Sequence, residues 1–79
     1  MTIEQLRTVH QAKLFRPFTM HLADGRALQV PHSEFLSHSP SGRTIIVYHA
    51  NDAFSIIDLL LVTELEVEGE HPRRKGQKR

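Results

Sequence analysis

The sequence predicts a mainly β, α+β fold, in which an N-terminal helix precedes a small bent antiparallel sheet or a partly open five-stranded barrel. Apolar residues recur at helical spacing only near the N-terminus, whereas later stretches alternate apolar and polar residues between turn formers. With 79 residues, the chain is expected to form one small domain over residues 1–70. Residues 71–79 are expected to form a disordered basic tail.

The first element is predicted to be an amphipathic helix over residues 3–13. Thr2 and Gln5 have the spacing of a capping box, in which two side chains satisfy backbone groups at a helix start. The expected apolar face consists of Ile3, Leu6, Val9 and Leu14. Pro17 ends the helical region, because the residue before a proline favours extended conformations.

Strands over residues 18–22 and 26–30 are predicted to form a hairpin. A three-residue loop, Ala23-Asp24-Gly25, pairs Phe18 with Val30, which keeps apolar residues on one face. Gly25 would supply the left-handed residue of this loop. The following residues, 31–42, are rich in turn formers, with one helical turn expected at residues 33–36.

Strands over residues 43–49 and 53–57 are predicted to form a second hairpin, joined by the two-residue turn Asn51-Asp52. This register pairs Val47 with Ile56 and His49 with Phe54. It assigns one face to the core, with Ile45, Val47, Phe54 and Ile56. The opposite face, with Ile46, Tyr48 and Ile57, is the predicted interaction surface.

The last strand is predicted over residues 61–67, after a short helical turn capped by Asp58. One side of it is expected to carry Leu61, Thr63, Leu65 and Val67. Glu64 and Glu66 would then face water.

This order of elements resembles the Sm-like fold, in which an N-terminal helix precedes five strands and a short xDGR hairpin, here residues 23–26, joins the first two. The Sm RNA-contact motifs are not recognisable residue by residue. The chain also resembles a group of short uncharacterised bacterial proteins. That resemblance rests on the strings RPFTMHLADGR, PHSEFL, SPSGRTIIVYH and FSIIDLLLVTELEV, and it implies no known activity.

Composition excludes several classes of function. The chain has no cysteine, which rules out disulfides, Cys-ligated zinc and thiol catalysis and fits a reducing cytoplasm. It has neither an export signal nor a run of apolar residues long enough for a membrane span, so no membrane partner is expected. Residues 1–70 hold five Lys/Arg and nine Asp/Glu, a net charge of −4, whereas residues 71–79 hold five basic residues.

Candidate catalytic chemistry is sparse. A metal site would draw on His21, His32, His38 and His49 with Asp24, Asp52 or Glu34, but their spacing is more typical of scattered surface histidines. Nucleophiles near these histidines would be Ser33, Ser39 and Ser41, which are more typical of turns. No enzyme, metal or cofactor is predicted.

Three functional hypotheses follow. The first is a non-enzymatic binding or adaptor module that self-associates, as a homo-oligomer, or binds a protein partner through its apolar sheet. The alternative is an Sm-like RNA-binding oligomer. Its candidate nucleic-acid contacts are Arg16, Arg26, Arg43, Arg73, Arg74, Lys75, Lys78 and Arg79. The third is a metal-dependent hydrolase that uses the histidines.

Overall fold

The structure is a computed structural model that describes residues 1–69. The basic tail predicted for residues 71–79 lies outside the described residues. The elements are α1 (Ile3–His10), β1 (Phe18–Leu22), β2 (Ala27–Val30), β3 (Leu36–His38), β4 (Thr44–Tyr48), β5 (Phe54–Asp58) and β6 (Val62–Val67). Three short 3-10 turns accompany them: η1 (Ser33–Phe35), η2 (Ala50–Asp52) and η3 (Leu59–Leu61). The predicted mainly β, α+β class is confirmed.

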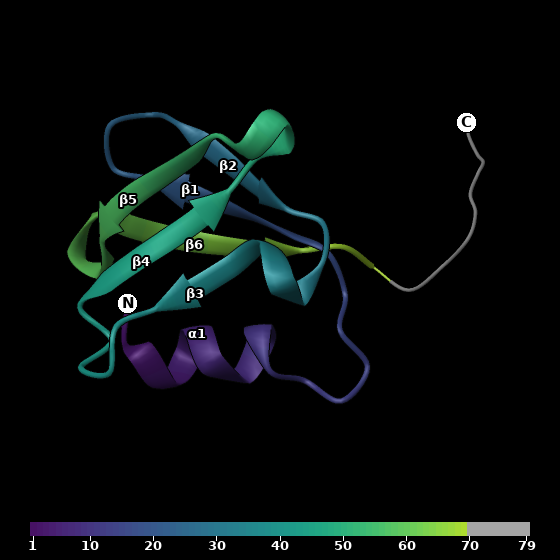
Figure 1. The fold of residues 1–79 in the computed structure, drawn as a ribbon. Helices are drawn as coiled ribbons and strands as arrows, with labels where there is room; N and C mark the ends of the chain where they lie inside the picture. Colours follow the sequence, from purple (N-terminus) through teal and green to yellow (C-terminus); the bar gives the residue numbers. More distant parts are fainter. Residues whose placement is uncertain (70–79) are drawn as a thin grey trace.

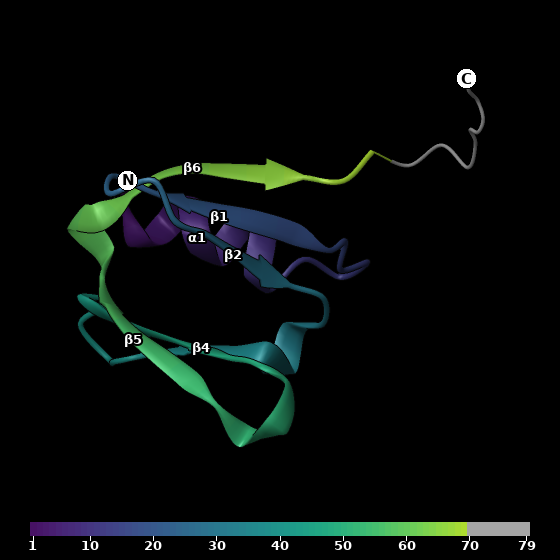
Figure 2. The same cartoon turned by 90° about the horizontal axis from the view of Figure 1, so that it is seen from above.

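The strands form two antiparallel three-stranded sheets, with the orders β2-β1-β6 and β3-β4-β5 (Figure 1). Figure 2 shows the two sheets facing each other, with η3 joining β5 to β6 at one end. The predicted single bent sheet or five-stranded barrel is therefore wrong in this detail. A sixth strand, β3, pairs with β4 and completes the second sheet.

The core lies between the two sheets. Its buried side chains are Leu6, Phe18, Met20, Leu22, Val30, Leu36, Ile45, Val47, Ile57, Leu59 and Val62. All are apolar, and no polar side chain among residues 1–69 is buried. Burial of this cluster is the main favourable contribution to folding, because apolar burial contributes about 25 cal/mol per Å².

Helix α1 covers one open side of the space between the sheets, next to β3 (Figure 1). The predicted capping box is present, since Thr2 Oγ1 accepts from Gln5 N at 3.2 Å and Gln5 Oε1 accepts from Thr2 N at 2.9 Å. The helix ends at His10 rather than at the predicted residue 13. Leu14, expected on the apolar face, is 85% exposed.

The β1–β2 hairpin has the predicted register, with Phe18 opposite Val30. Leu22 N donates to Arg26 O at 2.9 Å across the three-residue loop. Gly25 has a φ of 96°, the left-handed conformation that the prediction required.

The predicted register of the β4–β5 hairpin is wrong by one residue. The loop has three residues, and His49 N donates to Ala53 O at 2.8 Å across it. Tyr48 therefore lies opposite Phe54. A shift of one residue exchanges the two faces of a strand, so Ile57 enters the core while Ile56 points to solvent.

A β-bulge explains a second difference, in β6. Leu22 pairs with Val62 and His21 pairs with Glu64, which leaves Thr63 as the extra residue. The bulge lets Val62 reach the core, whereas Leu61 and Thr63, predicted on that side, are exposed. Asp58 caps η3 as predicted, since its Oδ1 accepts from Leu60 N at 2.9 Å.

Candidate interaction surface

The solvent side of β4 and β5 carries a cluster of apolar side chains, which we call the outer face and define as Ile46, Tyr48, Phe54 and Ile56. The register places Ile46 opposite Ile56 and Tyr48 opposite Phe54. The Tyr48 and Phe54 ring centroids are 6.4 Å apart. Tyr48, Phe54 and Ile56 are 40%, 57% and 65% exposed, although side chains of this kind are usually buried.

The outer face corrects the interaction surface predicted from the sequence. Ile46 and Tyr48 lie on it, but Ile57, the third predicted member, is only 3% exposed and belongs to the core. Phe54 and Ile56, predicted in the core, take its place. The position of Asp58 could have revealed the correct register. Asp58 lies two residues after Ile56, so the predicted register would turn its carboxylate towards the core, where an unpaired charge is costly.

Asp58 lies instead at the exposed end of β5, where it has two roles. It caps η3 through Leu60 N, and it pairs with Arg43, whose Nε lies 3.3 Å from Asp58 Oδ2. The hydrogen bond from Leu60 N and the charge of Arg43 hold the pKa of the Asp58 carboxyl below its ordinary value. The ion pair between Arg43 and Asp58 thus lies at the end of β5, and none of the four outer-face side chains carries a charge.

A cleft of about 530 Å³ opens between the sheets on the side opposite α1, and we call it the β2 groove. One wall is β2, through Ala27, Leu28 and Gln29. The other includes Phe35 from η1 and Tyr48 from the end of β4. Within residues 1–69, β2 pairs only with β1, so its second edge faces this groove.

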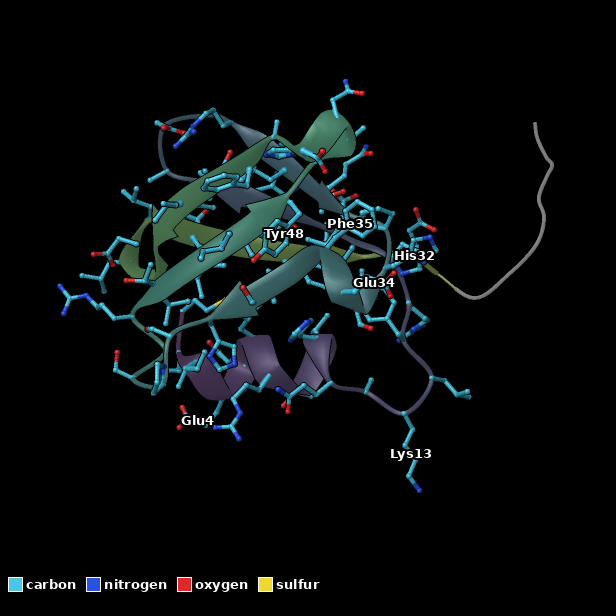
Figure 3. All side chains as sticks on the ribbon, in the orientation of Figure 1. Glu4, Lys13, His32, Glu34, Phe35 and Tyr48 are labelled. Atoms are coloured by element: carbon cyan, nitrogen blue, oxygen red, sulfur yellow. The ribbon has the colours of Figure 1, made fainter. Side chains whose placement is uncertain are left out.

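A second cavity of about 370 Å³ adjoins the β2 groove and shares Phe35 and Tyr48 with it. We call it the acidic cavity, because Glu34 and Asp52 are among its lining residues, together with Phe54. Figure 3 shows Phe35, Tyr48 and Glu34 gathered at this end of the molecule. Neither carboxylate forms an ion pair with a residue in the range 1–69.

The histidines considered as metal ligands do not come together. His21 Nε2 pairs with Glu66 at 2.8 Å, and His49 Nε2 bonds to Ser55 Oγ at 2.9 Å. His38 Nδ1 lies 2.8 Å from the carbonyl of the next residue, Ser39. No group of three or more His, Asp or Glu side chains within the described part of the chain is arranged to hold a metal ion.

The candidate nucleophiles hold turns together. Ser39 Oγ accepts from Thr44 N at 3.1 Å, and Ser41 Oγ accepts from Arg43 N at 3.3 Å. These bonds satisfy backbone donors where the chain enters β4. Ser33 lies in η1, where its carbonyl oxygen is 2.7 Å from His10 Nε2.

The arginines considered as nucleic-acid contacts are spread over the molecule. Arg26, at the tip of the β1–β2 hairpin, pairs with Asp24 at 2.9 Å, and the hydrogen bond from Arg26 N holds the pKa of Asp24 below its ordinary value. Arg43 pairs with Asp58. Arg16 precedes β1 at its opposite end. The five candidate contacts between Arg73 and Arg79 lie outside the described residues.

No helix within residues 1–69 is long and apolar enough to cross a membrane. A comparison with protein-family models, curated proteins and solved structures finds no match for this chain. The resemblances to the Sm-like fold and to short bacterial proteins therefore stay predictions.

Proposed function

We propose that the protein is a non-enzymatic interaction module that self-associates, with the outer face of one copy stacked on the outer face of a second. The observation that carries this proposal is the row of apolar cross-strand pairs, Ile46 with Ile56 and Tyr48 with Phe54, in which Ile46 is half-buried and the other three side chains are exposed. Water solvates such a surface poorly, and its burial in an interface is favourable.

A second copy of the chain fits the outer face for an electrostatic reason. None of the four outer-face side chains carries a charge. When two copies are related by a twofold axis through this face, apolar groups therefore meet apolar groups and no like charges face each other. Two sheets can stack about 10 Å apart with their side chains interdigitated. The ion pair between Arg43 and Asp58 would then lie at the rim of the interface, where it stays hydrated.

The interface is expected to be small. The strands β4 and β5 have five residues each, so they span about 17 Å at about 3.3 Å per residue. Two or three such strands cover less than the roughly 800 Å² per partner of a standard interface. We therefore expect a dissociation constant in the range of about 10 μM to 1 mM, which is the range of transient association.

Sedimentation equilibrium of the wild-type chain and two charge variants tests the proposal. Ile56→Glu places a carboxylate on the outer face at a residue that is 65% exposed, so the fold should tolerate it. Leu14→Glu is the matched control, because Leu14 is 85% exposed and lies outside the outer face. Circular dichroism should show that both variants keep the wild-type secondary structure.

The wild type and Leu14→Glu should show an average mass that rises towards that of a dimer as protein concentration rises to about 1 mM. Ile56→Glu should stay monomeric over the same range. A wild-type chain that remains monomeric at this concentration would overturn the proposal. Equal dimerisation of Ile56→Glu and the wild type would also overturn it, because the outer face would then not be the interface.

A further inference from the structure

We infer that the β2 groove binds an extended segment of a separate polypeptide, which adds a strand to β2 and places a lysine or arginine side chain in the acidic cavity. This site goes beyond self-association, because it takes a different partner and uses the edge of the other sheet that has no strand paired to it within residues 1–69. The inference rests on backbone geometry, an apolar wall and two acidic residues that have no ion-pair partner within residues 1–69.

The backbone of β2 offers a template for an added strand. In an antiparallel pair, opposite residues alternate between hydrogen-bonded and non-hydrogen-bonded positions. The bond from Leu22 N to Arg26 O makes that pair hydrogen-bonded, so two residues further along β2 the Leu28 pair is also hydrogen-bonded to β1. Ala27 and Gln29 occupy the alternate positions, and their N–H and C=O groups point away from β1, towards the β2 groove.

The residues that line the groove can contact every second side chain of an added strand. Leu28 is half-buried and faces the space between the sheets, and Phe35 and Tyr48 also line the groove. In strand addition, backbone hydrogen bonds supply affinity and pockets for alternate side chains supply specificity. Because β2 has four residues, the added strand is short.

The acidic cavity selects the charge of the partner. Glu34 and Asp52 lie beside aromatic rings there, and neither has an ion-pair partner within residues 1–69. Tyr48 and Phe54 are both exposed, with ring centroids 6.4 Å apart. Carboxylates and aromatic faces both attract a cation, so the complementary side chain is that of lysine or arginine.

The basic residues 71–79 of the chain itself are a weaker fit than a separate polypeptide. This segment supplies cations, but it contains no Val, Ile, Leu, Met, Phe, Tyr or Trp to contact the apolar wall. Pro72 also lacks the N–H that a ladder of strand hydrogen bonds requires. A partner segment that alternates aliphatic and basic residues can contact the apolar wall of the β2 groove and also place a cation in the acidic cavity.

Fluorescence polarisation with the probe fluorescein-Gly-Arg-Val-Arg-Val-Arg-amide tests the inference. The protein is the full chain carrying Ile56→Glu, because Ile56 lines neither cavity while self-association would compete for Tyr48 and Phe54. One control probe replaces the arginines with glutamate. The other carries N-methyl groups on the amides of both valines and of the arginine between them, so that it loses N–H groups on both edges of the added strand. Peptide binding and self-association are thereby measured separately, and either can fail alone.

Added variants locate the site. Gln29→Pro removes an N–H that faces the groove without touching the bonds to β1, and Gln29→Val changes the same side chain but keeps the N–H. The proline variant should bind the probe about tenfold more weakly than the valine variant. Glu34→Gln combined with Asp52→Asn should weaken binding about fivefold to tenfold.

The arginine probe should bind, whereas the glutamate and N-methyl probes should bind at least about tenfold more weakly. Equal binding of the N-methyl and unmodified probes would overturn strand addition even if Gln29→Pro fails to fold. Absence of binding by the arginine probe would overturn the site. If replacing the five basic residues of segment 71–79 by glutamine raises probe affinity about tenfold, the groove belongs to that segment and the separate partner is refuted.

Discussion

Replacing Gly42 with alanine should strongly destabilise the fold, because this glycine lies against helix α1. Gly42 has a φ of 79°, and a Cβ atom there would lie 2.5 Å from Ile3 Cγ1 and 2.7 Å from Ile3 Cβ. A left-handed backbone costs an L-residue about 1–2 kcal/mol, and overpacking costs about 1–3 kcal/mol. Together they amount to about 2–5 kcal/mol, a large share of the roughly 4–12 kcal/mol expected for a chain of this length.

Urea denaturation followed by circular dichroism measures this cost, and Gly25→Ala is the matched control. Gly25 also has a positive φ, 96°, but a Cβ there would meet nothing within 4 Å. The control should therefore lose only the backbone contribution of about 1–2 kcal/mol. Equal losses for Gly42→Ala and Gly25→Ala would refute the argument that Ile3 crowds Gly42. The reasoning further requires Ile3→Ala to relieve part of the Gly42→Ala loss in a double-mutant cycle.

Two further predictions concern β5. Ile57→Ala should lower the free energy of unfolding by about 2–4 kcal/mol and Ile56→Ala by less than about 1 kcal/mol, and the reverse order in urea denaturation would restore the register predicted from the sequence. The hydrogen bond from Leu60 N, together with the charge of Arg43, lowers the pKa of the Asp58 carboxyl in the folded state. The ionised carboxylate therefore stabilises the fold at pH values above the unfolded-state pKa of Asp58, and this stabilisation is lost as the pH falls through the folded-state pKa. Between about pH 6 and pH 3, the urea midpoint should therefore fall more for the wild type than for Asp58→Asn, and parallel curves would count against this role.

Elements with strong local signals were predictable from the sequence. The β1–β2 hairpin has its predicted register because Gly25 can adopt the left-handed conformation of the loop and because Phe18 and Met20 must share a face. The capping box at Thr2 and the cap at Asp58 are also confirmed, since each needs only residues close in sequence.

Elements that depend on distant partners were not predictable in the same way. Strand β3 has three residues in a stretch rich in turn formers, and its pairing with β4 is what makes it a strand. The helix ends at His10, whose side chain reaches the carbonyl of Ser33 in η1. The bulge at Thr63 appears only when β6 is aligned against β1.

The β4–β5 loop links fold prediction to site prediction. A turn of two residues and a turn of three both place Asn51 and Asp52 in the loop, and both residues have positive φ values, so the local sequence does not choose between them. The choice depends on the far end of the strand, where Asp58 must keep its carboxylate exposed. The same requirement that excludes Asp58 from the core turns Phe54 and Ile56 outward and creates the outer face. The proposed interface is therefore a consequence of the charge at the end of β5.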